Sequence, residues 1–333
     1  MKAVVYDRYG PPEVLRIADV ERPVAGPGRI LVRIHATAVT RFDDATRQAN
    51  RRSGIATSLL SRLVSGVRAP RQPILGSEFA GEVEAIGEGV TEFEVGDRVF
   101  ASTGLGLGAY TEAIALDEEA RVAPIPRGLT YAEAAAIPDG GLNALWCLRQ
   151  ADIGPGTRVL VFGASGAIGT AGVQLAKAFG AEVTGVCGPR NVELVRSLGA
   201  DTVIDYTAVD LTTDGRRYDV IFDAVGKSSF LRCRSSLRPG GRYLATDGFV
   251  NLVLAPTTRL AGGRRAIFTL PPRFTKEDLL YLKELVEGGR FRPVLDRIYP
   301  FEAIVEATRY VASERKVGNV ILAIDDAATQ PAV

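Results

Sequence analysis

The sequence has very little cysteine and histidine. Its 333 residues include three cysteines, Cys147, Cys187 and Cys233, and one histidine, His35. The cysteines are far apart in the sequence, which excludes CxxC redox chemistry and a small disulfide framework. Because protein zinc sites are built mainly from cysteine and histidine, this composition also argues against a zinc site of the usual kind.

The sequence also lacks an excess of either charge and any long hydrophobic run. It has 40 Lys and Arg against 39 Asp and Glu, a formal net charge of +1, which gives no support to binding of nucleic acid or of an anionic membrane surface. The sequence contains no run of about 20 apolar residues, the length that a helix needs to span a bilayer. Its first residues also lack the apolar region of a signal peptide. We therefore expect a cytoplasmic protein with no nucleic-acid or membrane partner.

What the sequence does contain is enough apolar material for two domains of ordinary size, since 46% of its residues are hydrophobic. Residues 1–125 carry short β-like runs separated by Gly and Pro, which predict a small, mostly β unit. From Tyr131 onward, apolar strand patterns alternate with helix patterns. This alternation predicts an α/β fold whose parallel sheet is covered by helices on both faces.

The most specific motif is a glycine-rich turn, GASGAIG, in which Gly163, Gly166 and Gly169 lie between a strand pattern (158–162) and a helix pattern (167–179). In dinucleotide-binding folds the first glycine permits the sharp turn, the second lets a pyrophosphate approach the backbone, and the third lets helix and strand pack closely. The helix N-terminus then offers N–H groups to the phosphates. The alternative is an ordinary glycine-rich turn between a strand and a helix.

The second strand of such a fold indicates which dinucleotide binds. A site for NAD usually has an acid after this strand, which accepts a hydrogen bond from the ribose 2′-hydroxyl. Residues 184–191 read TGVCGPRN and contain no acid, and Arg190 is the first charged residue. Because a guanidinium pairs with phosphate, Arg190 predicts NADPH as the cofactor. The alternative is that Arg190 is a solvated residue at the start of a helix.

Several further segments carry a family resemblance. They read KAVVYDRYGPPEVL, GSEFAGEVEAIGEGV, GDRVF, LVRSLGADTVIDY, YDVIFDAVG, LRPGGRY and VGNVIL. With the glycine turn, these segments span nearly the whole chain in order. On them the chain resembles the medium-chain dehydrogenase/reductase superfamily, and more closely its zinc-free quinone oxidoreductase branch, which includes zeta-crystallin.

The resemblance implies a GroES-like, mostly β catalytic domain made of residues 1–124 and 271–333, around a Rossmann doubly wound domain of residues 125–270. It also implies a homodimer formed near residues 266–270, the last strand of the Rossmann sheet. The residues expected to contact NADPH are Gly163, Ala164, Ser165, Gly166, Ala167, Ile168, Gly169, Gly188, Arg190, Asn191, Tyr206, Val225, Phe268, Leu270 and Asn319.

The resemblance also allows the zinc question to be asked position by position. Where zinc-using members have Cys-x-x-Asp, residues 40–43 read TRFD, and where they have Gly-His-Glu, residues 76–78 read GSE. The third ligand position falls at Asp139, which we otherwise expect to be the N-cap of a helix over 141–150. One carboxylate without thiolate or imidazole partners does not suit zinc, so we expect no metal.

The expected reaction follows from the missing metal. A simple alcohol is a poor substrate without a Lewis acid, which favours an activated acceptor, a quinone or another α,β-unsaturated carbonyl (enone). Thr40 and Asn143 are candidate hydrogen-bond donors to the developing enolate oxygen, and Asp43 or a water molecule would deliver the proton. We therefore expect a zinc-independent oxidoreductase that transfers hydride from NADPH to a quinone or enone.

Two departures from the quinone reductases keep other functions open. Thr40 stands where relatives often have Asn, and Ala45 stands where several have Tyr. Because those groups normally face the nicotinamide or substrate, their loss leaves two alternatives: a non-redox cyclase or isomerase on the same scaffold, and a noncatalytic NADPH-binding protein. The arginine-rich segment 41–71 is expected to form a surface helix, with a lid over the substrate cleft as the alternative.

Overall fold

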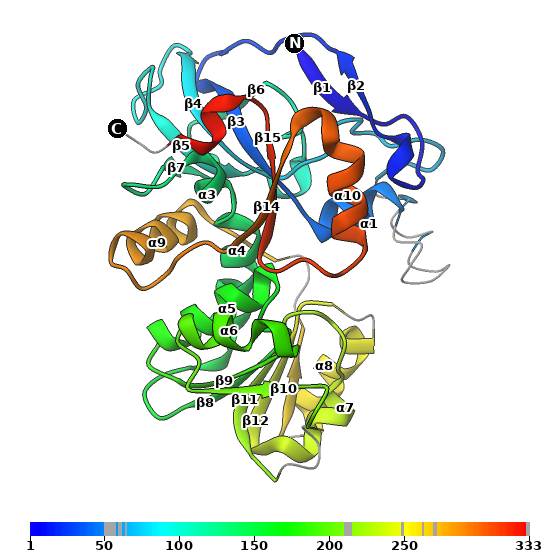
Figure 1. Ribbon diagram of the computed structural model, residues 1–333, viewed down its shortest axis with the longest axis vertical. Coiled ribbons are helices and arrows are strands. Elements are labelled where there is room, and N and C mark those ends of the chain that lie inside the picture. Colours follow the sequence, from blue (N-terminus) through cyan, green and yellow to red (C-terminus); the bar gives the residue numbers. More distant parts are fainter. Residues whose placement is uncertain are drawn as a thin grey trace. The chain divides into compact units, whose positions relative to one another are not determined.

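The computed structural model describes residues 1–49, 58, 62–63, 65–209, 215–247, 250–261, 263–268 and 272–330 of the chain. The chain forms two compact units, each with its own sheet (Figure 1). The first unit contains residues 1–139, 279–283 and 295–333, and the second contains residues 140–278 and 284–294. The first unit is therefore discontinuous in sequence.

The first unit is mostly β. Its sheet has the order β14-β15-β3-β4-β5-β7, with β6 also paired to β3, and a separate hairpin joins β1 to β2. The strands are β1 (Lys2–Val5), β2 (Arg16–Asp19), β3 (Arg29–Val39), β4 (Glu78–Ile86), β5 (Arg98–Ser102), β6 (Ala113–Asp117), β7 (Val122–Pro124), β14 (Leu295–Pro300) and β15 (Asn319–Ala323). Because β15 pairs antiparallel with β3, the C-terminal strands complete a sheet that the N-terminal part begins.

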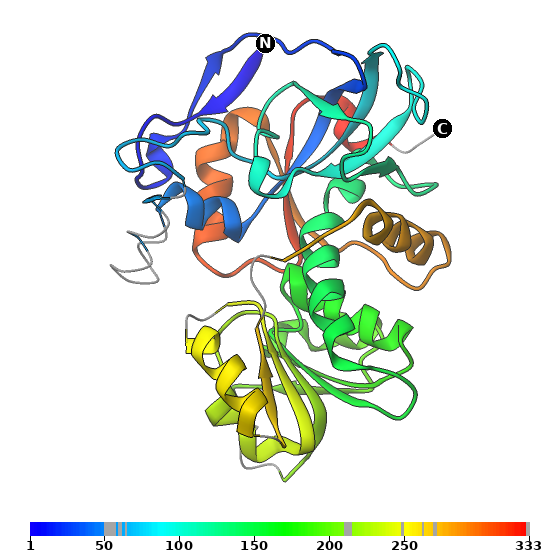
Figure 2. The same cartoon turned by 180° about the vertical axis from the view of Figure 1, so that it is seen from behind.

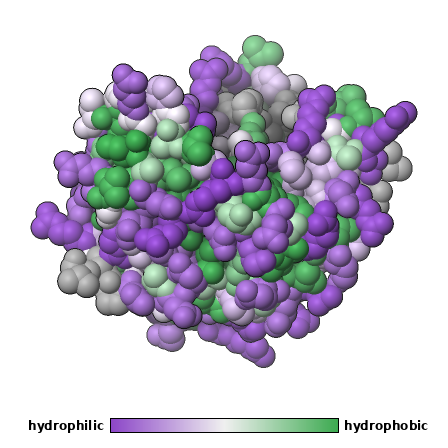
Figure 3. All heavy atoms as spheres, turned by 90° about the horizontal axis from the view of Figure 1, so that it is seen from above, coloured by the Kyte–Doolittle hydropathy of each residue, from purple (hydrophilic) through white to green (hydrophobic). Residues whose placement is uncertain are grey.

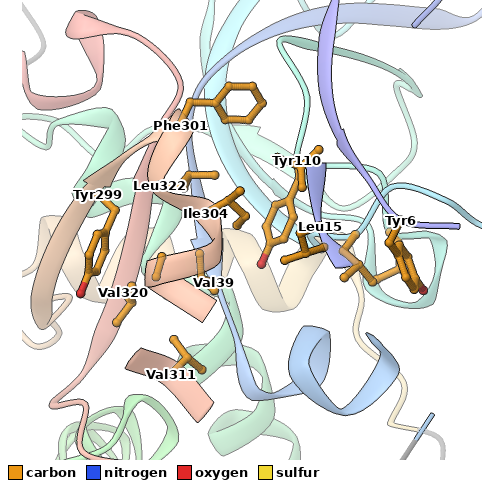
Figure 4. Packing of buried hydrophobic residues seen from close by; sticks show 14 of the residues in the cluster. Tyr6, Leu15, Val39, Tyr110, Tyr299, Phe301, Ile304, Val311, Val320 and Leu322 are labelled. Atoms are coloured by element: carbon orange, nitrogen blue, oxygen red, sulfur yellow. The ribbon is translucent and has the colours of Figure 1, made fainter. Parts of the chain in front are cut away.

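Two helices, α3 (Tyr131–Ala135) and α10 (Ile304–Ala312), pack against this sheet, and α1 (Arg41–Arg47) packs against α10. Figure 4 shows how side chains from β3, β15 and α10 converge on one apolar core, which includes Val39, Leu322 and Val311. Burying each large apolar side chain of this kind stabilises the fold by about 1.5–3 kcal/mol. This core therefore joins sequence segments that are almost the whole chain apart.

The second unit is built on one six-stranded sheet with the order β10-β9-β8-β11-β12-β13, and every neighbouring pair is parallel. The strands are β8 (Arg158–Phe162), β9 (Glu182–Cys187), β10 (Thr202–Asp205), β11 (Tyr218–Asp223), β12 (Leu237–Ala245) and β13 (Arg265–Ile267). The strand order reverses between β8 and β11, which is where open α/β sheets bind their ligands. The predicted α/β fold class, a mostly β unit plus a doubly wound parallel sheet, is confirmed.

Helices lie on both faces of the parallel sheet, as its continuous apolar strands predict. They include α5 (Ala167–Ala178), α6 (Val192–Ser197), α7 (Phe230–Cys233) and α8 (Val250–Ala261). Figures 1 and 2 show α5 and α6 on one side of the sheet and α7 and α8 on the other. The described residues also form the helices α4 (Pro138–Leu148) and α9 (Lys276–Glu287).

Some expected positions differ from the structure. Asp139 is not the N-cap of its helix, because α4 begins one residue earlier, at Pro138. Proline favours the first helical position, where its fixed φ suits the helix and no N–H is needed. The first unit extends past the expected boundary at residue 124, because α3 packs on β3 and β4. Residues 272–278 and 284–294, expected in the catalytic domain, group with the parallel sheet.

Two expectations fall on parts of the chain that the structure does not describe. Leu270 and much of the arginine-rich segment 41–71 lie outside the described residues. Among the helices that the structure does describe, none is long and apolar enough to cross a bilayer. On the face drawn in Figure 3, hydrophilic side chains separate the apolar ones into small groups.

The buried charge on α1 yields a stability prediction. Arg47 is fully buried (0% exposed) and donates hydrogen bonds to the Asp44 carboxylate and the Gly10 carbonyl. Because Arg47→Ala removes a fully buried cation from beside the buried Asp44 carboxylate, we expect the free energy of unfolding to fall by about 3–5 kcal/mol. Urea unfolding measures this. The control is Arg41→Ala on the same helix, which removes an exposed ion pair with Glu314 and should cost about 0–1 kcal/mol; equal losses would contradict the prediction.

Candidate active site

The turn after β8 has a shape that only glycine permits. Gly163 has a φ of +71°, in the left-handed region. A Cβ added to Gly163 would also lie 2.3 Å from Cγ1 of Val225, which packs against this turn from the end of β11. Conformation and space therefore both exclude a side chain at Gly163.

The next glycine of the motif lies where the backbone is open. Gly166 is the N-cap of α5, with no side-chain cap. A Cβ on Gly166 would meet only the carbonyl oxygen of Gly163, at 3.6 Å. The N–H groups of the first helical turn, at Ala167, Ile168 and Gly169, have no acceptor within a helix by their position. This end of α5 can therefore offer backbone N–H groups and its positive dipole to an anion such as a diphosphate.

The third glycine brings the helix onto the turn. A Cβ on Gly169 would lie 2.0 Å from the carbonyl oxygen of Gly163 and 2.8 Å from the Cα of Ala164. The turn is fixed further by Ala164, whose N–H donates to the Val186 carbonyl at 2.9 Å. The three glycines thus have the three physical properties that a phosphate-binding turn requires.

A second group of the expected residues gathers at the carboxyl ends of β9 and β10. The Tyr206 N–H donates to the carbonyl of Cys187 (3.2 Å), and a Cβ on Gly188 would contact the Tyr206 ring at 3.6 Å. Tyr206 is 62% exposed. Asn191 connects this region to the glycine turn, because its Nδ2 donates to the Ser165 hydroxyl at 3.1 Å.

Arg190 lies in the same short segment, Pro189–Asn191, between β9 and α6. Its side chain is exposed, and no ion pair to it occurs within the part of the chain that the structure describes. No acidic residue lies between Cys187 and Val192. A cation without an acidic neighbour in this segment suits a phosphate and does not suit the free hydroxyls of a ribose.

The expected residues at the other end of the nucleotide are divided between the two units. In the second unit, Val225 borders Gly163, Asn143 lies on α4, and Phe268 follows β13 and packs against the apolar core. In the first unit, Asn319 is the buried first residue of β15. Thr40 and Asp43 also belong to the first unit.

Thr40 and Asp43 form one tight hydrogen-bonded network. Thr40 is the N-cap of α1, and its hydroxyl donates to Asp43 Oδ2 at 2.7 Å. The same carboxylate accepts from the Thr40 N–H (3.0 Å), the Tyr110 hydroxyl (2.9 Å) and the Gly76 N–H (3.0 Å). Asp43 is only 2% exposed. Four donors around one buried carboxylate make Asp43 an anchor that ties α1 to the segments containing Gly76 and Tyr110.

Two effects act in opposite directions on the pKa of Asp43, and the larger of them, burial, raises it. Burial raises the pKa of Asp43, while the hydrogen bonds from Thr40, Tyr110 and Gly76 act to lower it. Burial and the nearby Asp43 together raise the pKa of Tyr110 well above its usual value, so the phenol keeps its proton and remains a donor. In this network Thr40, Tyr110 and Gly76 are the hydrogen-bond donors, and the Asp43 carboxyl group at the centre is their shared acceptor.

Two further acids lie close together in the first unit. Glu78 begins β4, and its Oε2 accepts from the Ser77 hydroxyl at 2.8 Å. Burial, and then the charges of Asp139 and Asp43, raise the pKa of Glu78 well above its usual value. Burial likewise raises the pKa of Asp139, and Lys316 opposes that shift. Glu78 and Asp139 are therefore close enough for the charge of Asp139 to act on Glu78.

Sequence reasoning missed several members of these networks. Tyr110 and Lys316 lie far in sequence from the residues they influence, and no local motif marks either of them. Gly76 belongs to the GSE segment, but nothing in that segment shows that its N–H donates to Asp43. Burial lowers the pKa of Lys316, and its Nζ donates to the Gly318 carbonyl at 2.7 Å. Within the described residues, no group of three or more His, Cys, Asp or Glu side chains is arranged to hold a metal ion.

The cysteines offer no nucleophile to this site. Burial raises the pKa of Cys147 to about 12 and, with a smaller effect of Asp205, the pKa of Cys187 to about 11. A thiol reacts as its thiolate, which is scarce near neutral pH at such values. Covalent cysteine catalysis is therefore not what these residues support.

Comparison with known proteins gives the class. Residues 26–127 match the family described as alcohol dehydrogenase GroES-like domain, and residues 198–322 match the family described as zinc-binding dehydrogenase. A quinone oxidoreductase of Pseudomonas aeruginosa is 30% identical, over 96% of this chain and 99% of that protein. An NADPH-dependent alkenal/one oxidoreductase of Arabidopsis thaliana chloroplasts is 28% identical, over 97% of this chain and 79% of that protein.

Solved structures give the same result. The quinone oxidoreductase from Coxiella burnetii has a TM-score of 0.85 at 27% identity and covers 98% of this chain and 99% of its own. An NAD-dependent alcohol dehydrogenase has a TM-score of 0.79 at 28% identity, covering 98% and 100%. The chain is a member of the medium-chain dehydrogenase/reductase family. Within that family it belongs to the quinone oxidoreductase branch, so the resemblance seen in the sequence is confirmed.

The glycine turn yields a paired prediction. Gly166→Ala places its methyl group in open space, so we expect an unchanged melting temperature but nucleotide binding weakened about tenfold or more, because the methyl occupies the approach of the diphosphate. Gly169→Ala forces α5 away from Gly163 and should lower the melting temperature as well. Thermal unfolding and a nucleotide titration measure both. Unaltered binding by Gly166→Ala would contradict the assigned phosphate site.

Proposed function

We propose that the protein is an oxidoreductase that transfers hydride from NADPH to a quinone or another α,β-unsaturated carbonyl without zinc. The observation that carries this proposal is the glycine turn, where Gly163, Gly166 and Gly169 leave the N-terminus of α5 open to a diphosphate. The relatives named as quinone oxidoreductase and as NADPH-dependent alkenal/one oxidoreductase support the same chemistry.

The preference for NADPH rests on the end of β9. Arg190 is exposed and lies two residues after Gly188, which borders the Tyr206 ring. An acid at this place would favour the ribose hydroxyls of NADH and repel a 2′-phosphate. A guanidinium instead pairs with phosphate through two parallel hydrogen bonds. The nicotinamide cofactor that fits these residues is therefore the phosphorylated one.

The absence of zinc from the proposed mechanism rests on the donor set. Of the three positions that hold zinc in other family members, Thr40 and Ser77 carry hydroxyls, and both hydroxyls are already bonded to carboxylates, those of Asp43 and Glu78. The third position is Asp139. Hard oxygen donors engaged in hydrogen bonds do not form the nitrogen and sulfur set that zinc prefers.

When bound, the reduced nicotinamide supplies a hydride to an electrophilic carbon of the substrate. The chain's own residues then have to hold the reactants in place, exclude water and accommodate charge on the substrate oxygen. The Thr40 hydroxyl already donates its hydrogen bond to Asp43. Thr40 can therefore donate to a substrate oxygen only if its hydroxyl turns away from that carboxylate. Asn143 remains the other candidate donor.

The proton is best assigned to water. Asp43 accepts four hydrogen bonds and is almost fully buried, which suits an anchor and not a residue that gives up a proton. Conjugation in a quinone or enone delocalises the charge left by the hydride, so a strong acid at the oxygen is not required. This favours the activated acceptor over a simple ketone.

We also propose a homodimer and a cytoplasmic location. Among the strands that the structure describes, β13 pairs with β12 alone and is the edge strand of its sheet, which gives a second copy an edge to extend. The cysteines are all free thiols, as in proteins of a reducing compartment.

The cofactor assignment is tested with Arg190→Ala. Loss of a charge-assisted contact should weaken NADPH binding about 10–100-fold, and NADH binding should stay unchanged because it lacks the 2′-phosphate. Nucleotide titration of wild type and variant measures both constants. The control is Arg196→Ala on α6, which removes only an exposed pair with Glu193. Equal losses for both nucleotides would reject the role of Arg190.

The reaction itself is tested by screening quinones, enones and simple ketones for NADPH oxidation, followed by loss of nicotinamide absorbance. We expect turnover with conjugated acceptors only. A protein that binds NADPH but oxidises it with no acceptor would instead be the noncatalytic nucleotide-binding alternative, and conversion of substrate without NADPH oxidation would indicate a cyclase or isomerase.

A further inference from the structure

A buried carboxylate that neither the mechanism nor the glycine motif uses lies at the end of β11. Asp223 is 0% exposed. In the parallel sheet it is paired in register with Phe162, the residue directly before Gly163. An acid in an apolar core is costly unless its oxygens are fully hydrogen-bonded. Asp223 therefore lies beside the glycine turn that begins at Gly163.

The carboxylate of Asp223 collects donors from the loop that follows it. Its Oδ1 accepts from the N–H groups of Val225 (3.2 Å) and Gly226 (2.9 Å). Its Oδ2 accepts from the Ser228 N–H (2.8 Å) and the Tyr243 hydroxyl (2.9 Å). The backbone therefore curls around one side chain, and three of the four donors belong to residues 225–228.

The remaining features hold this loop in one conformation. Gly226 has a φ of +67°, and a Cβ on it would lie 2.8 Å from the Cβ of Asp247. Burial and the charge of Asp223 raise the pKa of Tyr243, so its hydroxyl stays protonated and can donate. The loop begins against β8, because the Ala224 N–H donates to the Phe162 carbonyl at 3.2 Å.

The consequence is the placement of Val225. Its side chain lies so close to Gly163 that a Cβ added there would be 2.3 Å from Cγ1 and 2.8 Å from Cγ2 of Val225. The valine is nevertheless 40% exposed, so one part of it covers the turn and another part is open. This wall stands where the strand order reverses, between β8 and β11, whereas Gly188 and Tyr206 mark the ends of β9 and β10.

We propose that Asp223 is a positioning residue for the cofactor, which fixes the 224–228 loop so that Val225 walls the diphosphate and nicotinamide half of the bound nucleotide and leaves the adenosine half untouched. This inference rests on the proposed nucleotide site. It adds a residue that never touches the nucleotide and acts on one half of it.

The test compares a whole nucleotide with a fragment of it. Asp223→Asn keeps the size of the side chain but replaces one accepting oxygen by an amide NH₂ group. That group is itself a donor and faces two of the donors that Asp223 now binds, which loosens the loop. Val225→Ala keeps all four hydrogen bonds and removes only the wall. The control is Asp219→Asn on the same strand, whose carboxylate is bonded to Arg238 and to the Arg158 N–H, away from the loop.

Dissociation constants are measured by calorimetry for NADPH and for 2′,5′-ADP, which carries only the adenosine half. We expect Asp223→Asn and Val225→Ala to weaken NADPH about tenfold or more, to leave 2′,5′-ADP within about twofold, and Asp219→Asn to change neither. A purely structural role of Asp223 would instead weaken both ligands together.

The outcomes separate the two proposals. If wild type binds both ligands and Asp223→Asn binds both as wild type does, or loses both equally, the positioning role is wrong and the proposed nucleotide site stands. If Asp223→Asn does not fold, Val225→Ala decides, and unchanged NADPH binding by that variant overturns the inference. If wild type binds neither ligand, the proposed function is wrong, and the positioning role falls with it.

Discussion

The close approach of α5 to the turn after β8 is the contact on which the nucleotide site depends. With no side chain at Gly169, the first turn of the helix rests on the carbonyl of Gly163, and a single methyl group there would overlap it. That approach places unpaired backbone N–H groups at the carboxyl end of β8. Since these groups belong to the backbone, the anion site needs glycine at the right places more than any particular polar side chain.

The parallel register carries this arrangement to the rest of the sheet. Phe162 at the end of β8 is paired with Val186 on β9 and with Asp223 on β11, and Asp205 at the end of β10 is paired with Cys187. The strand ends are therefore level, and the residues that follow them emerge at one edge. This is why Gly163, Gly188, Tyr206 and the loop after Asp223 lie at the same side of the sheet, although they are spread over some sixty residues of sequence.

This division explains what the sequence could and could not predict. The glycine turn, the parallel sheet and the residues after each strand follow from local spacing and from apolar runs, which act over a few residues. The position of Asp139 was predicted wrongly because two local signals compete, a capping acid and a proline, and the proline fixed the helix start. The hydrogen bond from Tyr110 to Asp43 could not be predicted, because Tyr110 comes from a distant segment that only the folded sheet brings near.

Buried carboxylates organise the backbone in both units. Asp43 in the first unit and Asp223 in the second each accept four hydrogen bonds, so both serve as anchors for the backbone around them. Glu78 is also buried, and the Ser77 hydroxyl donates to it. Burial, and then the charges of Asp139 and Asp43, raise its pKa well above the usual value, which favours its protonated form.

The hydrogen bonds of Thr40 and Ser77 bear on the proposal of a zinc-free reaction. Where zinc-using members have a cysteine and a histidine, Thr40 and Ser77 carry hydroxyls that donate to carboxylates, so those side chains are held by hydrogen bonds. Such a network positions side chains but adds no Lewis acid, so in the proposed reaction the substrate's own conjugation stabilises the charge that the hydride leaves. The turn after β8 offers backbone groups, whereas the candidate donors to the substrate, Thr40 of the first unit and Asn143 of the second, are side chains. We therefore expect substitutions at Thr40 and Asn143 to alter the choice of substrate more than the binding of the diphosphate.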